Sequence, residues 1–201
     1  MPKIRLRHSI AVTAAALLLT ACASAGEEGG SASGPADDET ALADRLTQIE
    51  DAVETWIASS TITEAHAAAE AAANLVVGPN GPGYGDRDRD GAIRGDTDLG
   101  LLPGLDGTPD GIAFTAAANP CVERDVLGGS WDDPAAAWEQ MLMAIDEWEP
   151  ANNTMPTLAS HPMRIVGWST FTIESDSLDD AHEYGGHAQL HVAVSMSALD
   201  C

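Results

Sequence analysis

Basic residues are scarce in this chain of 201 residues, and lysine is almost absent. The single lysine, Lys3, and two arginines, Arg5 and Arg7, lie close together at the N-terminus. Subtracting these three from nine basic residues leaves six arginines against 32 acidic residues, a net charge of −26. Such a charge repels the phosphates of nucleic acids and anionic lipid head groups, and it attracts cations. The composition therefore excludes nucleic acid as a partner.

The sequence also lacks the common motifs of catalysis and nucleotide binding. No Gly-x-Ser-x-Gly pattern of a serine nucleophile occurs, and no glycine-rich phosphate loop precedes an expected helix. No Cys-x-x-Cys pair occurs either. No residue is therefore assigned a catalytic role, and a non-enzymatic protein is favoured.

The N-terminal residues have the layout of a secretory signal, with a cationic start, an apolar run over 10–19 and small residues after it. The apolar run is shorter than the roughly 20 residues that span a bilayer. The segment Leu-Thr-Ala-Cys that ends at Cys22 resembles the bacterial lipobox, which implies cleavage before Cys22 and lipidation of its thiol. The alternative is an ordinary signal peptide cut within 23–25, which would release a secreted protein.

These features predict three parts of the chain. Residues 1–21 are expected to form a lipoprotein signal peptide, and residues 22–36, rich in Gly, Ser and Ala, a flexible tether. Residues 37–201 are long enough for one domain with its own core. The predicted location is the cell envelope, outside the cytoplasm, with the lipid on Cys22 anchoring the chain to a bacterial membrane.

Two cysteines remain once Cys22 is lipidated, namely Cys121 and Cys201. An even pair in an oxidising compartment favours a disulfide that pins the C-terminus. Two free thiols and thiolate metal ligands are the alternatives.

Apolar residues recur at helical spacing in several segments of the domain. A helix is also favoured over a strand in a further segment, 155–176, although it is rich in β-branched and aromatic residues. In the third helix, Trp138, Met141, Leu142 and Ile145 are expected to be buried. The predicted fold is mainly α, a four- or five-helix bundle with a long ordered acidic loop, 78–111, inserted after the second helix. The expected helices span 38–59, 62–77, 132–150, 155–176 and 178–199.

The acidic loop carries three alternating aspartates, Asp86, Asp88 and Asp90, followed by Gly91. Calcium binds six to eight oxygen atoms, and alternating carboxylates in a tight turn can face one ion. In these positions, and in Ile93, which is expected to anchor the loop in the core, the segment resembles an EF-hand or dockerin-type calcium loop. The resemblance implies calcium as cofactor.

The resemblance further implies that Ala92 offers its backbone carbonyl to the ion. The loop departs from that family at the twelfth position, where Thr97 replaces the acidic ligand; Asp96 and Asp98 flank it and are the candidates to close the site. The alternative is a solvated acidic turn in which arginines at 87, 89 and 94 are internal partners. The stretch 65–91 also resembles uncharacterised exported helical bacterial proteins, which implies no activity.

Histidines and acids form two lines at helical spacing. Glu183, His187 and His191 share one helix face, and His66 and Glu70 share another. If the two helices face each other, these residues form a site for a transition metal such as iron, zinc or copper. Ordinary hydrogen-bonded histidines are the alternative.

Together these patterns predict an envelope-anchored lipoprotein, a non-enzymatic binding or structural module whose acidic loop binds calcium. The alternative prediction is a lipoprotein that binds a transition metal through the histidine and carboxylate lines. The sequence indicates no particular protein or envelope partner.

Overall fold

The computed structural model describes residues 35–201 of the chain. The predicted signal peptide, Cys22 and all but the last two residues of the predicted tether lie outside the described residues. Within 35–201 the chain is mainly helical and has no strand, which confirms the mainly α fold class. None of the described helices is both long and apolar enough to cross a membrane.

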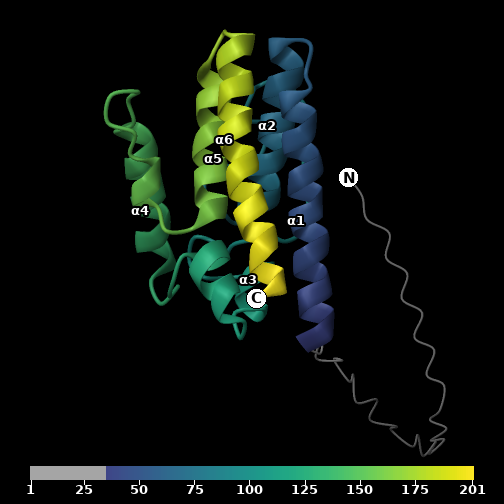
Figure 1. Cartoon of the computed structure of the whole chain (residues 1–201), viewed down its shortest axis with the longest axis vertical. Helices are drawn as coiled ribbons and strands as arrows, with labels where there is room; N and C mark the ends of the chain where they lie inside the picture. Colours follow the sequence, from purple (N-terminus) through teal and green to yellow (C-terminus); the bar gives the residue numbers. More distant parts are fainter. Residues whose placement is uncertain (1–34) are drawn as a thin grey trace, which may run out of the picture. The chain divides into compact units, whose positions relative to one another are not determined.

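Four long helices lie side by side and enclose the core (Figure 1). Helix α1 packs against α2 and α6, and α5 packs against α6 and α2. The segment whose composition also suited a strand therefore forms a helix at the centre of the domain. The four helices are α1 (Pro35–Ile57), α2 (Ile62–Val77), α5 (His161–Glu174) and α6 (Leu178–Ser197).

Side-chain caps explain where most of these helices begin. Thr61 and Glu64 form a capping box at the start of α2, in which each side chain accepts a backbone N–H of the other. Ser160 caps α5 and Ser177 caps α6 through their hydroxyl groups. Each cap satisfies an amide that has no partner inside its helix.

The apolar stripe of α1 points into the core, as its spacing predicts. Its members are all at most 1% exposed, and the last, Trp56, donates its indole N–H to the carbonyl of Ala181 on α6 at 2.8 Å. A Cβ atom at Gly185 would lie 2.9 Å from Ile57 and 3.3 Å from the Trp56 ring. Glycine at 185 therefore lets α1 and α6 approach closely. The stripe consists of Leu42, Leu46, Ile49, Val53 and Trp56.

Shorter helical turns close one end of the domain. They are α3 (Ile112–Thr115), the π-helical turn η1 (Val122–Leu127) and the 3₁₀ turn η3 (Ala198–Asp200). Cys121, just before η1, and Cys201, just after η3, lie at disulfide distance, with Cα atoms 6.1 Å apart. Sequence periodicity predicts none of these turns.

Helix α4 (Pro134–Asp146) lies outside the group of four long helices, with α5 as the long helix that it contacts (Figure 1). The 3₁₀ turn η2 (Met155–Thr157) follows it. The cap of α4 is Asp133, with proline in its first turn. Trp138 and Met141 are buried as expected, but Ile145 is only half-buried and Leu142 is 49% exposed. The expectation of a fully buried apolar face is thus wrong for Leu142, because α4 packs on the domain along only one edge.

Candidate metal centre

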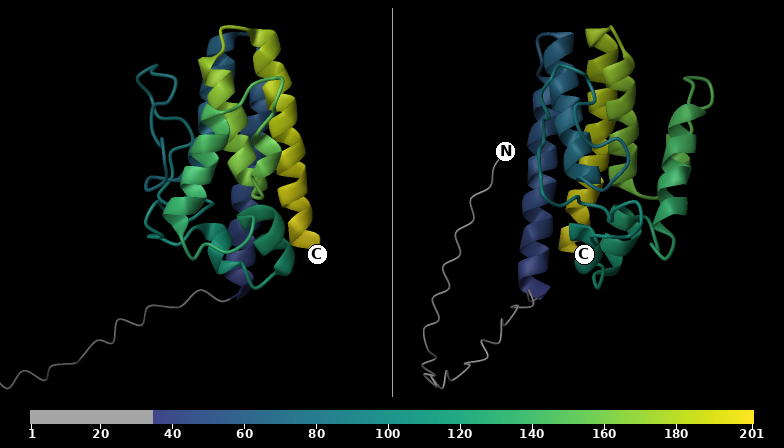
Figure 2. Two further views of the ribbon diagram at one scale, coloured as in Figure 1. Left: turned by 90° about the vertical axis from the view of Figure 1, so that its left-hand side faces the viewer. Right: turned by 180° about the vertical axis from the view of Figure 1, so that it is seen from behind.

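Residues 78–111 contain no helix and run along α2, as the right-hand view of Figure 2 shows. Backbone amides of Leu101 and Leu102 donate to the last-turn carbonyls of α2 at Leu75 and Val76, at 3.1 and 3.0 Å. These bonds satisfy carbonyls that a helix end leaves without partners. The second half of the loop is therefore fixed to the end of α2.

Arg45 of α1 clamps the same part of the loop. Its guanidinium donates to the carbonyls of Leu75 and Leu99 and to the hydroxyl of Thr97, the last at 2.7 Å. The Thr97 hydroxyl in turn donates to the Leu99 carbonyl at 3.1 Å. Thr97, at the twelfth position of the calcium-type loop, thus takes part in internal hydrogen bonds.

The first half of the loop is held by a buried carboxylate. Glu70 lies on α2 with no exposed surface. One of its oxygens accepts the amides of Arg87 and Asp88, and the other accepts the amide of Arg94 at 2.7 Å. Three charge-assisted hydrogen bonds therefore tie two separate points of the loop to one side chain.

Asn74, one helical turn after Glu70, adds a second polar anchor. Its amide nitrogen donates to the carbonyls of Gly85 and Arg94 at 2.9 and 2.8 Å, and its oxygen accepts the Gly85 amide at 3.2 Å. Ile93, by contrast, is 48% exposed. The expectation that Ile93 anchors the loop in the core is therefore wrong, since buried polar groups of α2 hold the loop instead.

The three alternating aspartates stabilise the turn between these anchors. Asp86 accepts the amide of Gly91 at 3.0 Å, Asp88 that of Asp90 at 3.0 Å, and Asp90 that of Ala92 at 2.8 Å. The bonds of Asp88 and Asp90, each to the amide two residues further along, are typical of aspartate in tight turns, whereas the bond of Asp86 spans five residues. Gly91 has φ +92°, a conformation that glycine adopts without strain.

Asp86 and Asp88 meet Glu70 at one point. One carboxylate oxygen from each of the three lies within 4.8 Å of the others, and no other such group of acids, histidines or cysteines occurs within 35–201. Two oxygens that bind one calcium at about 2.4 Å lie at most about 4.8 Å apart. The spacing and the all-oxygen chemistry therefore suit a hard divalent cation.

The arginines of the loop balance only part of this charge. Arg87 is half-buried and donates to the Pro82 carbonyl at 3.0 Å; burial lowers its pKa to about 10, and the charge of Glu70 opposes that shift. The amide of Ala92 and, after it, the guanidinium of Arg94, which pairs with Asp90 at 3.2 Å, hold the pKa of Asp90 below its usual value. Within residues 35–201, the side-chain ion pairs engage neither Asp86 nor Asp88.

The remaining predicted calcium ligands lie elsewhere. Asp96 accepts the hydroxyl of Tyr84 at 2.6 Å, and the burial of that hydroxyl, more than Asp96 itself, raises the pKa of Tyr84. Asp98 is exposed, and Asp90 makes the turn and ion-pair contacts given above. The three-carboxylate group of the described chain includes none of these three aspartates.

The two histidine lines do not converge on a shared point within residues 35–201. His66 bonds the Ser175 carbonyl at 2.9 Å, while Glu183 is exposed. The ring of His187 stacks on Trp168 with centroids 4.5 Å apart. Glu70, which belongs to the line with His66 in sequence, is the acid that joins the loop aspartates instead.

His191 forms a pair with His161 of α5, their Nδ1 atoms 3.0 Å apart. Such a bond needs one neutral ring to donate and the other to accept. Burial is the main cause that lowers the pKa of both rings; Arg164 adds to it in both, and Asp125 opposes it at His161. The pair is a candidate source of acid sensitivity.

Acidification is expected to destabilise the fold through His191. Its pKa is lowered to about 3 by burial and by the charges of His161, Arg164 and His187. An unfolded histidine titrates near pH 6.5. Below that pH the unfolded chain takes up a proton that the folded chain does not, so this contribution to stability is lost as the pH falls from about 6.5 toward 3.

Urea unfolding at pH 7 and pH 5 measures this effect. The variant His191→Gln lacks the titrating ring and should lose less stability between the two pH values than the unchanged chain does. The carboxylates titrate alike in both proteins, so the difference between them reports on His191. An equal loss in both proteins would show that His191 does not contribute.

Comparisons of the chain with protein-family models, with curated proteins and with solved structures each found no match. The acidic centre is therefore interpreted from its own chemistry.

Proposed function

We propose that the chain is an envelope-anchored lipoprotein and a non-enzymatic binding or structural module whose acidic loop binds one calcium ion. The observation that carries the proposal is the meeting of Glu70, Asp86 and Asp88 at mutual distances suited to one cation. In this proposal the four long helices form the bundle that presents the loop, and the lipid on Cys22 and the tether 22–36 hold the domain outside the cytoplasm.

Calcium is favoured over softer metals by the ligands. The three side chains offer only carboxylate oxygens, which suit calcium, magnesium or manganese rather than a metal that prefers nitrogen or sulfur. Calcium tolerates an irregular oxygen shell, whereas magnesium demands near-octahedral geometry. An irregular set drawn from a helix and a loop therefore suits calcium best.

Glu70 would replace the acidic ligand that the loop lacks at Thr97. In a calcium loop of the family type, the last ligand is an acid of the same loop. Here the buried Glu70 faces the first two aspartates from α2. Because three amides also hold Glu70, the loop is ordered before the ion arrives. Calcium then adds stability to a loop that the protein already holds.

A rise in melting temperature on addition of calcium is the expected result. A ligand that binds only the folded state at 100 times its dissociation constant adds about 2.7 kcal/mol to the free energy of unfolding. With a dissociation constant on the order of 10⁻⁴ M, as in extracellular calcium modules, 10 mM calcium supplies that excess. Thermal unfolding of the purified protein in chelator and in 10 mM calcium measures the rise.

The variant Asp88→Asn should abolish the calcium-dependent rise, and the matched variant Asp98→Asn should keep it. Parallel runs with zinc distinguish the transition-metal alternative, which needs His66, His187 and His191. A rise with zinc alone, lost on replacing those histidines, would overturn the calcium proposal.

A further inference from the structure

A groove lies between α4 and the α5–α6 pair, and one of its lining residues, Glu174, also lines a neighbouring hollow with Arg87 and Asp88 of the acidic loop. It encloses about 890 Å³, a volume within the range of about 300–1,000 Å³ that is usual for small-molecule sites. Its lining comes from α4, from the residues just after α4, and from α5 and α6. Figure 1 shows that α4, which supplies half of the lining, stands off from the four long helices.

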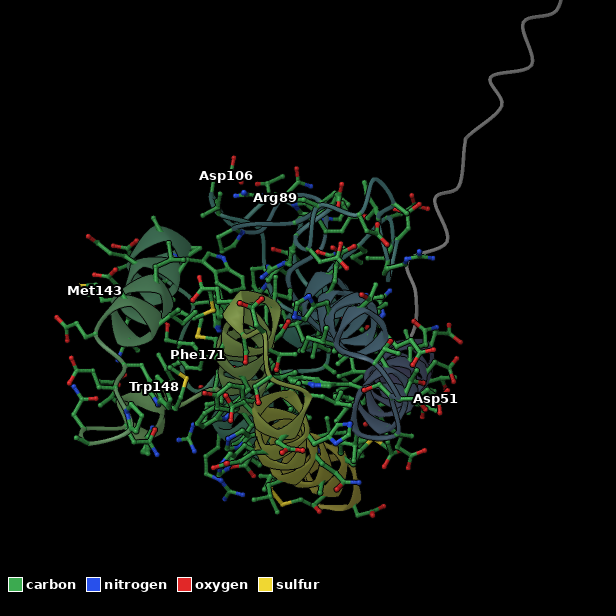
Figure 3. The ribbon with its side chains drawn as sticks, turned by 90° about the horizontal axis from the view of Figure 1, so that it is seen from above. Asp51, Arg89, Asp106, Met143, Trp148 and Phe171 are labelled. Carbon is green, nitrogen blue, oxygen red and sulfur yellow. A yellow bond between two sulfur atoms is a disulfide. The ribbon has the colours of Figure 1, made fainter. Side chains whose placement is uncertain are left out.

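Aromatic rings line the groove. Trp148 and Phe171 lie next to each other (Figure 3), and their rings stack with centroids 4.3 Å apart. The ring of Tyr184 packs edge-on against both, with centroid distances of 6.0 Å. The ring of Trp168 stacks on that of Tyr184, with centroids 5.6 Å apart. The rings therefore brace one another and form a preorganised aromatic wall.

Carboxylates surround this wall. Glu139, Asp146 and Glu174 line the groove and are exposed, and its lining, within the described part of the chain, includes no arginine, lysine or histidine. The acids of the lining make the field inside the groove negative, although Glu174 also lines a neighbouring hollow with Arg87 and Arg89. An anionic ligand is disfavoured and a cation is favoured.

The groove also presents apolar surface. Leu142 and Met143 of α4 line it and are 49% and 50% exposed. Covering such side chains with an apolar group removes apolar surface from water, which favours binding. Aromatic faces attract organic cations, which unlike metal ions need no shell of oxygen ligands. The ligand that fits all three features carries a positive charge on an apolar body.

We propose that this groove binds a small organic cation of the quaternary ammonium class. The cationic group lies against Trp148 and Tyr184, the acids at the rim attract it, and Leu142 and Met143 cover its apolar part. The cation contacts neither the acidic loop nor its metal in this proposal, and Glu174 is the lining residue that the groove shares with the hollow beside the loop.

The test is a titration of the full chain, in chelator, with benzyltrimethylammonium, followed through the chemical shifts of the indole N–H groups. Benzyl alcohol, which has the same ring without the charge, is the comparator. Benzyltrimethylammonium is expected to bind saturably and about tenfold more tightly, the effect of a partly desolvated cation–π contact. Equal binding of the two compounds would overturn the proposal.

Rim variants test the site without disturbing the core. Asp146→Asn combined with Glu139→Gln, which leaves Glu174 and the neighbouring loop unchanged, should weaken binding of the cation several-fold and leave benzyl alcohol unaffected. Glu147→Gln removes an exposed acid next to the groove that does not line it, and it should bind as the unchanged chain does. Trp148→Leu should abolish binding. Unchanged binding in the rim double variant would contradict the assignment.

A quaternary ammonium group can also belong to a lipid. Flotation with phosphatidylcholine vesicles, using protein without its lipid anchor, separates the two sources. Binding of free benzyltrimethylammonium without vesicle association is the expected result, since the groove lies between helices. Vesicle association without binding of the free cation would overturn the proposal of a small-molecule site.

Discussion

Replacing Glu70 with glutamine is expected to lower the free energy of unfolding by about 2–4 kcal/mol, even in chelator, because three partly buried amides lose their charge-assisted acceptor. The carboxylate accepts amides of Arg87, Asp88 and Arg94 and has no exposed surface. Glutamine keeps only one acceptor oxygen. Its NH₂ group would face backbone N–H donors of the loop, with which it cannot form a hydrogen bond. Urea unfolding monitored by circular dichroism measures the loss.

Glu54→Gln is the matched control, because Glu54 lies exposed on α1. This change should alter the free energy of unfolding by less than about 0.5 kcal/mol. Hydrogen exchange should also rise at the amides of 87, 88 and 94 in Glu70→Gln. A variant as stable as the unchanged chain, with those amides still protected, would show that Glu70 does not hold the loop.

Removing both Cys121 and Cys201 is expected to cost about 4 kcal/mol of the free energy of unfolding, because a disulfide that closes so long a loop restricts the unfolded chain. The two residues are 80 positions apart, and their Cα atoms lie 6.1 Å from each other. The separation suits a disulfide without backbone movement. The double serine variant and the reduced unchanged chain should have the same lowered urea midpoint.

Agreement between those two proteins is the informative control, since reduction changes no side-chain volume. If the double variant were as stable as the oxidised chain, the pair would not be cross-linked. A thiol assay of the denatured, unreduced protein that finds Cys121 and Cys201 reactive would also show that the disulfide is absent.

The long helices follow directly from local sequence. The stripe on α1 and the caps Thr61, Asp133, Ser160 and Ser177 depend on residues within a few positions of each other. The helix at 161–174 is the hardest to predict, because its many β-branched and aromatic residues also suit a strand. In the structure this segment packs against α2 and α6. Tertiary packing overrides its strand propensity there.

The short turns and the packing of α4 could not be predicted from periodicity. Segments such as α3 and η1 are too short to show a helical period. The exposure of Leu142 depends on how far α4 stands from α5, and the sequence of α4 does not encode that distance.

Only part of the acidic centre could be predicted from sequence. The spacing of Asp86 and Asp88 marks them as ligands on chemical grounds, and they meet in the structure. The sequence places Glu70 in the histidine line instead, because no local rule relates a helix residue to a loop beyond the end of that helix. Its helical neighbour Asn74, the other buried polar residue of α2, is the available signal that this face holds a polar segment.

A calorimetric titration of the purified protein with calcium tests the proposed metal centre most directly. One ion should bind per chain, with a dissociation constant on the order of 10⁻⁴–10⁻³ M. Binding should vanish in the double variant Asp86→Asn with Asp88→Asn and persist in Asp98→Asn. Absence of calcium binding, or binding that survives in the double variant, would contradict the assignment of Glu70, Asp86 and Asp88 as the calcium site.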